Sequence, residues 1–168
     1  MKVGTDGVLL GAWAPVDHRP ETILDIGTGS GLIALMLAQR TDAEQIDALE
    51  IDPDAYEQAT ENFEESPWGD RLFCFHAGLD EFLDDPEQQY DLIVSNPPFH
   101  TEHISPSDAA RKLARFADSL PLEELVAAAS VLLSPTGFFA VILPFKMESH
   151  FISGMQEAGF HLAKLTRV

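Results

Sequence analysis

The 168-residue sequence contains one cysteine and no long apolar run. Cys74 cannot form an internal disulfide and lies in an apolar stretch, so we expect a buried, reduced thiol. No segment has the length and apolarity of a membrane-spanning helix. The first residues also lack the apolar core and cleavage site of a secretory signal. The composition therefore predicts a cytoplasmic protein without a membrane segment.

Positive charge is also scarce. Ten lysines and arginines stand against 28 aspartates and glutamates, which gives a net charge of −18 at pH 7 and a pI of about 4.4. This balance excludes nucleic-acid binding through a broad basic face. The acidic residues are scattered rather than grouped, a pattern that fits a surface adapted to high salt, where charges are strongly screened.

Hydrophobic residues make up 45% of the chain, enough for the core of one domain over residues 1–168. Strand-like and helix-like segments alternate, which predicts an α/β fold with a mostly parallel sheet and helices on both faces. Strands are predicted at Thr22–Ile26, Gln45–Ile51, Leu72–His76, Gln89–Ser95, Phe138–Leu143 and from Phe160 onward. Helices are predicted at Asp6–Trp13, Leu32–Arg40, Pro53–Glu65, Leu122–Leu133 and Met147–Ala158.

Both ends of the sequence suggest a fragment of a longer protein. Only five residues precede the helix predicted at Asp6–Trp13, and the strand predicted from Phe160 runs to the last residue. A last strand without a neighbour would leave an apolar edge exposed, which folded proteins avoid. We therefore expect the strand that closes the sheet at its C-terminal side to be absent.

A glycine-rich loop, Asp25 to Gly31, follows the first predicted strand. Glycines allow a tight turn and a close approach of a ligand to the backbone, and the next helix presents its amides there. The spacing Gly-x-Gly-x-Gly differs from the Gly-x-Gly-x-x-Gly of dinucleotide sites, which remain the weaker alternative. It resembles the first motif of class I S-adenosylmethionine-dependent methyltransferases. We assign Gly27 and Gly29 to the cofactor site, with Asp25 bracing the loop or reaching the methionine ammonium group through water.

Glu50 and Ile51 extend this predicted cofactor site at the end of the second strand. A carboxylate at that place can accept hydrogen bonds from both ribose hydroxyls of a nucleoside, and Asp52 is a competitor for the role. The adenine end is less defined. Class I methyltransferases often have an aspartate after the third strand, where this sequence has Gly78, with Asp80 two residues later.

The tetrapeptide Asn96-Pro97-Pro98-Phe99 follows the fourth predicted strand. The Asn96 side-chain oxygen and a turn carbonyl can accept hydrogen bonds from one NH₂ group, the prolines fix the backbone, and Phe99 can stack on a flat substrate. Two acceptors make a delocalised amine more nucleophilic, and the sulfonium methyl group of the cofactor is already activated. The turn predicts methyl transfer to a planar nitrogen. Asn96, Pro97 and Phe99 are the predicted catalytic residues, and Asn96 also borders the cofactor.

The residues after this turn suggest few further sites. His100 and His103 lack carboxylates or cysteines at metal-ligand spacing, so no metal site is predicted. The densest basic cluster is formed by Arg111, Lys112 and Arg115. These side chains are candidates for phosphate contacts if the partner is RNA, or they offset the surrounding acidic charge.

Four blocks, Lys2–Ala14, Asp25–Gly31, Ser95–Phe99 and Ala114–Leu120, carry a family resemblance. Together the chain resembles the bacterial adenine-N6 methyltransferases that modify valine tRNA next to the anticodon. The resemblance implies a Rossmann-like class I methyltransferase fold, S-adenosylmethionine as cofactor and tRNA as partner. It also implies that Thr5 and Asp6 lie near the methionine end of the cofactor.

Two alternatives remain open from the residues. The same chemistry could act on guanine N2 in ribosomal RNA, adenine in DNA or a protein glutamine, because all present a planar nitrogen and Asn96–His100 fits ribosomal guanine enzymes as well. A different class of protein, a cofactor-binding but inactive fragment, is favoured by the short ends and by Gly78.

Overall fold

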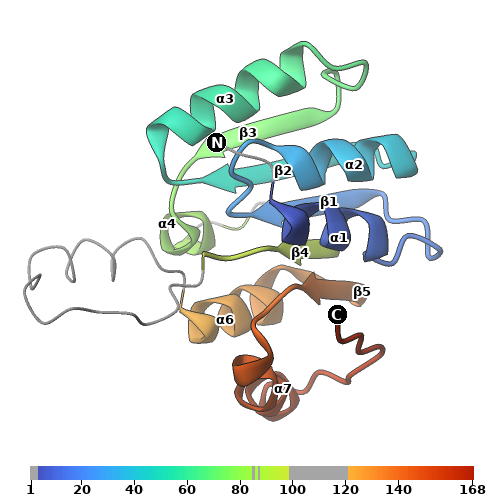
Figure 1. The fold of residues 1–168 in the computed structure, drawn as a ribbon, viewed down its shortest axis with the longest axis vertical. Coiled ribbons are helices and arrows are strands. Elements are labelled where there is room, and N and C mark those ends of the chain that lie inside the picture. Colours follow the sequence, from blue (N-terminus) through green and yellow to red (C-terminus); the bar gives the residue numbers. More distant parts are fainter. Residues whose placement is uncertain (1–3, 85, 87, 99–120) are drawn as a thin grey trace, which may run out of the picture.

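The computed structural model describes residues 4–84, 86, 88–98 and 121–168. Five strands form one sheet in the order β3-β2-β1-β4-β5 (Figure 1). They are β1 (Thr22–Ile26), β2 (Gln45–Glu50), β3 (Leu72–His76), β4 (Tyr90–Ser95) and β5 (Leu133–Val141). Every neighbouring pair is parallel. The predicted parallel sheet is confirmed, and the first four strands lie within one residue of their predicted bounds.

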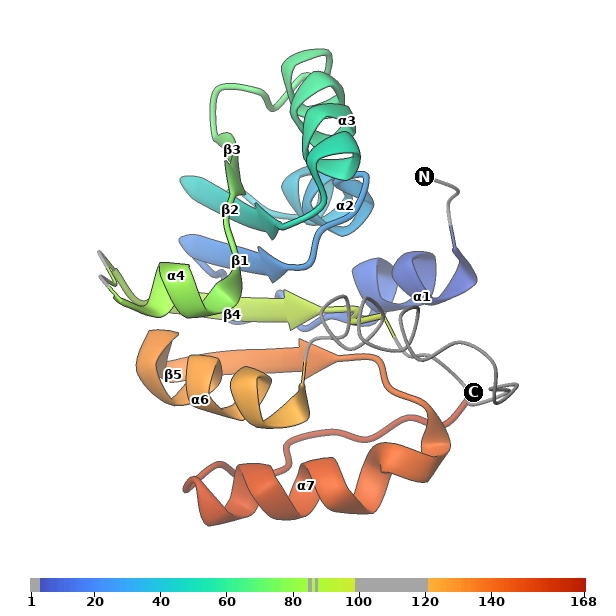
Figure 2. The same ribbon diagram turned by 90° about the vertical axis from the view of Figure 1, so that its left-hand side faces the viewer.

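Helices cover both faces of this sheet (Figure 2). The structure contains α1 (Thr5–Trp13), α2 (Leu32–Arg40), α3 (Pro53–Glu64), α4 (Leu79–Asp84), α6 (Leu122–Leu132), the 3₁₀ turn η1 (Phe145–Met147) and α7 (Glu148–Glu157). Alternate strand residues supply two cores: Ile23 packs in the core that includes residues of α1, α2 and α3, and Leu24 in the core that includes residues of α4 and α6. Burial on both faces explains the continuous apolar runs Ile23–Leu24 in β1 and Leu92–Val94 in β4.

Helix α1 is fixed against α2, and its first turns lie at the carboxyl edge of the sheet, where Gly7 approaches Asn96. The Arg40 guanidinium donates to the carbonyl oxygens of Gly11 and Ala14 at the end of α1. A Cβ atom at Gly11 would lie 2.6 Å from the Met36 sulfur, so the two helices approach closely at this glycine. The helix predicted at Asp6–Trp13 is confirmed.

The C-terminal segment differs from the prediction. β5 begins at Leu133 and ends at Val141, earlier than predicted, and the strand predicted from Phe160 is wrong, because residues 160–168 form no regular secondary structure. A strand requires a main-chain ladder with a neighbour. Here an apolar groove of about 410 Å³ is lined by residues 138–143 on one side and 160–168 on the other. Side-chain contacts hold the segment instead, among them a 3.0 Å hydrogen bond from Trp13 Nε1 to Thr166.

Candidate active site

Three chain segments meet at the carboxyl edge of the central strands. The amide groups of Gly27 and Thr28 donate to the Leu49 carbonyl oxygen at 3.0 and 2.9 Å, which ties the glycine loop to the end of β2. The Ser95 hydroxyl donates to the Ile26 carbonyl oxygen at 2.9 Å, which ties the end of β4 to the same loop. The sequence motifs after β1, β2 and β4 are therefore held together at one edge of the sheet.

The glycine loop uses its glycines for two different reasons. Gly27, Gly29 and Gly31 have φ angles of 71°, 61° and 81°, in the left-handed region that favours glycine. A Cβ atom at Gly27 would meet nothing within 4 Å, whereas one at Gly31 would lie 2.5 Å from the Phe63 ring. Gly27 therefore borders open space that a ligand can use, while Gly31 allows α3 to pack against the loop.

Asp25 is fully buried beneath this loop and is only half satisfied. Its Oδ2 atom accepts a 2.6 Å hydrogen bond from the Thr28 hydroxyl. Its Oδ1 atom is buried and accepts no hydrogen bond from the part of the chain that the structure describes. Burial raises the pKa of Asp25 to about 7, although the Thr28 hydroxyl and the nearby Ala34 amide oppose the rise. A buried carboxylate oxygen without a partner needs a donor or a cation, and the ammonium group of S-adenosylmethionine is both.

Glu50 is largely buried and braces the loop through both carboxylate oxygens. Oε2 accepts from the Gly29 amide at 2.7 Å, and Oε1 accepts from the Asp52 amide at 2.9 Å. Each oxygen keeps a further lone pair that can accept from a ribose hydroxyl. Asp52 has a different task, because its side chain caps α3 by accepting from the Ala55 amide at 2.8 Å. Glu50 therefore keeps acceptor capacity at the end of β2, whereas the Asp52 carboxylate is engaged at the start of α3.

The structure brings Ile51, Gly78 and Asp80 together beside Glu50. The Ile51 side chain is 63% exposed. A Cβ atom at Gly78 would lie 3.8 Å from Ile51 Cδ1 and 2.5 Å from Asp80 Oδ1. The Asp80 carboxylate therefore occupies the space that a side chain at position 78 would take. Sequence reasoning identified both positions but could not place the Asp80 carboxylate over Gly78.

His76, which the sequence analysis left without a role, supports this part of the site. Its Nε2 atom lies 3.1 Å from the Ile51 carbonyl oxygen, and its ring stacks on Tyr56 with the centroids 5.1 Å apart. These contacts fix the backbone that presents Ile51. The only signal in the sequence was its position at the end of the third strand.

The turn after β4 lies against α1. Asn96 is half-buried, Pro97 is buried and Pro98 is exposed. A Cβ atom at Gly7 would lie 3.8 Å from Asn96 Nδ2, so the first turns of α1, which include Thr5, cover one side of Asn96. Sequence reasoning placed Thr5 near the cofactor but did not predict this approach of α1 to Asn96. Phe99, Arg111, Lys112 and Arg115 lie outside the described residues.

Neither a metal-binding cluster nor a membrane-spanning helix is present among the described residues. No group of three or more histidine, cysteine, aspartate or glutamate side chains in the described ranges could hold a metal ion. No described helix combines the length and the apolarity needed to cross a bilayer.

Comparison with known proteins identifies the family. The model of the methyltransferase small domain matches residues 8–160. A protein of Flavobacterium johnsoniae named tRNA1(Val) (adenine(37)-N6)-methyltransferase is 67% identical over 168 residues, which are 100% of this chain and 72% of the relative. A protein of Pectobacterium carotovorum with the same name is 46% identical over 169 residues, 100% of this chain and 68% of the relative. The chain belongs to this methyltransferase family.

Solved structures of other methyltransferases share the fold. A ribosomal protein L11 methylase from Lactobacillus delbrueckii superposes with a TM-score of 0.68 at 21% identity, covering 96% of this chain and 70% of the other. TrmN from Thermus thermophilus gives a TM-score of 0.62 at 23% identity, covering 90% and 40%. The predicted Rossmann-like class I methyltransferase fold is confirmed, and the protein is a methyltransferase.

Proposed function

We propose that this methyltransferase transfers a methyl group from S-adenosylmethionine to N6 of adenine 37 in tRNA1(Val). The observation that carries the proposal is the 2.9 Å bond from the Ser95 hydroxyl to the Ile26 carbonyl oxygen, which joins the Asn96 turn to the glycine loop. This bond sets the acceptor turn beside the cofactor loop. The name of the relatives that are 67% and 62% identical over the whole chain supports the choice of base and tRNA.

The residues of the glycine loop and of the ends of β2 and β3 fit the cofactor. Asp25 would pair with the methionine ammonium group, and Glu50 would accept from the ribose hydroxyls. Ile51 would pack on the adenine ring, with the Asp80 carboxylate placed to accept from the adenine amino group. Gly27 and Gly29 let the ligand approach the backbone. When bound, the cofactor supplies an activated methyl group on a positively charged sulfur.

The acceptor turn would orient the adenine amine. The Asn96 side-chain oxygen accepts a hydrogen bond from the N6 amino group, and α1 holds Asn96 from the side of Gly7. Pro97 is buried and fixes the backbone of the turn. This arrangement needs no strong base, since the work of the site is positioning. Two contacts stay predictions: stacking of Phe99 on the base, and phosphate contacts by Arg111, Lys112 and Arg115. A cytoplasmic location also stays a prediction, which a tRNA substrate supports.

The test is methylation of defined transcripts. Wild-type protein and S-adenosylmethionine are incubated separately with unmodified tRNA1(Val), with the same tRNA carrying guanine at position 37, and with a ribosomal RNA fragment. We expect N6-methyladenosine in the first transcript alone, measured by nucleoside mass spectrometry. N2-methylguanosine in a ribosomal RNA fragment, with no product in the tRNA, would assign the enzyme to the alternative substrate.

A further inference from the structure

The chain after β5 leaves the sheet beside the acceptor turn. The Ile142 amide donates to the Ser95 carbonyl oxygen at 3.3 Å, next to Asn96. Phe145 follows three residues later and begins η1. Because a chain advances at most about 3.6 Å per residue, Phe145 lies within roughly 15 Å of Ser95. This segment is therefore close enough to contact a substrate that reaches Asn96.

The Phe145 ring is exposed and lies beside an arginine. Phe145 is 73% exposed, compared with 45% for Phe73 and 41% for Phe75. Pro144 precedes it, and the Pro144 carbonyl oxygen accepts from the Met147 amide at 2.8 Å. The Arg167 guanidinium lies 5.4 Å from the ring centroid and is fixed by two hydrogen bonds to Glu148, of 3.0 and 2.8 Å. A solvent-facing aromatic ring beside cations is the arrangement that stacks on unpaired bases.

The cations of this acidic protein are unevenly distributed. Two described arginines, Arg40 and Arg71, donate to main-chain carbonyl oxygens inside the fold. Three other described cations, Lys146, Lys164 and Arg167, follow β5 in the chain. They supply positive charge to a protein whose net charge is −18.

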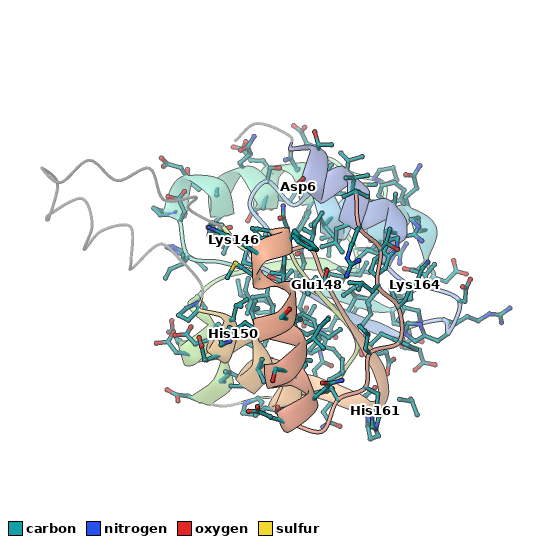
Figure 3. All side chains as sticks on the ribbon, turned by 60° about the horizontal axis from the view of Figure 1, so that its bottom comes forward. Asp6, Lys146, Glu148, His150, His161 and Lys164 are labelled. Atoms are coloured by element: carbon teal, nitrogen blue, oxygen red, sulfur yellow. The ribbon has the colours of Figure 1, made fainter. Side chains whose placement is uncertain are left out.

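Lys146 is the cation nearest to the exposed ring in sequence. It is exposed, and no residue in the described ranges forms an ion pair with it. Figure 3 shows Lys146 at the amino-terminal end of α7, at the same end of the molecule as Asp6 of α1, while His161 lies at the opposite end of α7. The position of Lys146 suits a phosphate of a substrate bound at the acceptor edge.

We propose that Phe145 and Lys146, supported by Arg167, form a platform for an unpaired nucleotide next to the methylated base. The Phe145 ring stacks on that base, and Lys146 contacts its phosphate. This inference rests on the proposed function, because it takes RNA as the substrate. Single-stranded loops expose bases that an aromatic ring can stack on, which suits a target next to an anticodon. Few cations are then needed, since stacking supplies affinity that a broad basic face would otherwise provide.

The test compares tRNA binding of Phe145→Ala and Lys146→Ala with that of two matched controls. Phe73→Ala removes another exposed aromatic ring, on β3, and Arg19→Asn removes another exposed cation, ahead of β1. Asparagine suits the φ of 54° at position 19. We measure the Kd and KM for tRNA1(Val) transcript at several KCl concentrations, and the affinity for S-adenosylhomocysteine by calorimetry.

Phe145→Ala should raise the Kd and KM for tRNA about ten-fold, and Phe145→Trp should restore them, because base stacking is lost and regained. Lys146→Ala should weaken tRNA binding and lower the slope of log Kd against log [KCl] by about one. Both variants should keep the affinity for S-adenosylhomocysteine, and both controls should match wild type. The platform would be overturned, with the proposed function intact, by the following result. Wild type methylates the transcript, but Phe145→Ala and Lys146→Ala bind tRNA as tightly as the two controls do. Failure of wild type to methylate the transcript would instead overturn the proposed function.

Discussion

The strands around the cofactor loop and the chain after β5 are held by different kinds of contact. In β1, Ile23, Leu24 and Asp25 are fully buried, and the loop that follows is tied to β2 by main-chain hydrogen bonds. In α7 no residue is fully buried, and residues 160–168 are joined to the rest by surface contacts such as the hydrogen bond between the half-buried Trp13 and the exposed Thr166. The cofactor side therefore depends on fully buried packing and buried polar groups. The C-terminal side depends on half-buried apolar contacts, such as Phe151 against Phe139, and on exposed hydrogen bonds, for which water competes.

The difference suits the two tasks of a methyltransferase. A site for a small cofactor requires a fixed pocket, and preorganised buried groups provide it. A surface for a large RNA requires exposed rings and charges, which cannot be buried without losing their role.

Asn96→Ala should lower kcat for tRNA about 100-fold or more, because the amine of the adenine loses its positioned acceptor. Cofactor affinity should stay nearly unchanged. Methylation of tRNA1(Val) with labelled S-adenosylmethionine gives kcat, and calorimetry with S-adenosylhomocysteine gives the affinity. A large loss of cofactor affinity instead would show that Asn96 belongs to the cofactor site rather than to the acceptor site.

Asp25→Asn should change how stability depends on pH. The pKa of Asp25 in the folded protein, about 7, lies above its ordinary value of 3.8, so the folded state holds this proton more tightly. The stabilising effect is complete below pH 3.8 and is lost as the pH rises to 7. Between pH 5 and pH 8 wild type should lose about 3 kcal/mol relative to the variant.

Denaturant unfolding of wild type and Asp25→Asn at pH 5 and pH 8 measures this difference. The same carboxylate should make S-adenosylhomocysteine binding stronger as the pH rises through 7, since its charged form pairs with the ammonium group. The variant should bind weakly at every pH. Parallel stability curves for the two proteins would show that Asp25 is not the group that titrates.

Glu50→Ala should weaken cofactor binding by roughly 1–3 kcal/mol, as expected for lost hydrogen bonds to a charged group. The Gly29 and Asp52 amides also lose their acceptor, so the glycine loop should become less ordered. The matched control is Asp52→Ser, which keeps a side chain that can cap α3. Calorimetry with S-adenosylhomocysteine compares the cofactor affinities of the Glu50 and Asp52 variants. A loss of affinity confined to the Asp52 variant would make Asp52 the ribose ligand.

Two glycine substitutions compare the regions directly. Gly31 and Gly159 have φ angles of 81° and 91°, so alanine is strained at both. A Cβ atom at Gly31 meets Phe63, whereas one at Gly159 meets nothing within 4 Å. Gly31→Ala should lower the free energy of unfolding by about 2–3 kcal/mol and Gly159→Ala by about 1 kcal/mol. Equal losses in thermal unfolding would contradict the proposed difference in packing.

Thr166→Ala should have the smallest effect. It removes the exposed hydrogen bond from Trp13 Nε1, which contributes about 0.5–1 kcal/mol at most. The melting temperature should stay within experimental error, while amide hydrogen exchange in residues 160–168 becomes faster. A clear drop in the melting temperature would show that this segment is part of the cooperative core.

Much of the fold was predictable because local pattern and tertiary environment agree. Thr22–Ile26 and Leu72–His76 are strands with the predicted bounds, and Leu32–Arg40 is a helix with the predicted bounds. The strand expected at Phe160–Val168 failed because strand formation depends on a partner, and these residues make side-chain contacts across a groove instead. An apolar pattern indicates which segment can form a strand, but it does not indicate whether a neighbouring strand is available to pair with it.

The glycine loop, the acid at the end of the second strand and the Asn96 turn could be read from the amino-acid order alone, since each motif needs particular residue types in a fixed local order. How these motifs combine became visible in the folded chain. The tertiary structure placed the Asp80 carboxylate over Gly78, left one oxygen of Asp25 buried without a donor, and set Gly7 of α1 against Asn96. The physical reason is that these relations join residues distant in sequence or depend on side-chain direction, and both are fixed only when the helices pack on the sheet.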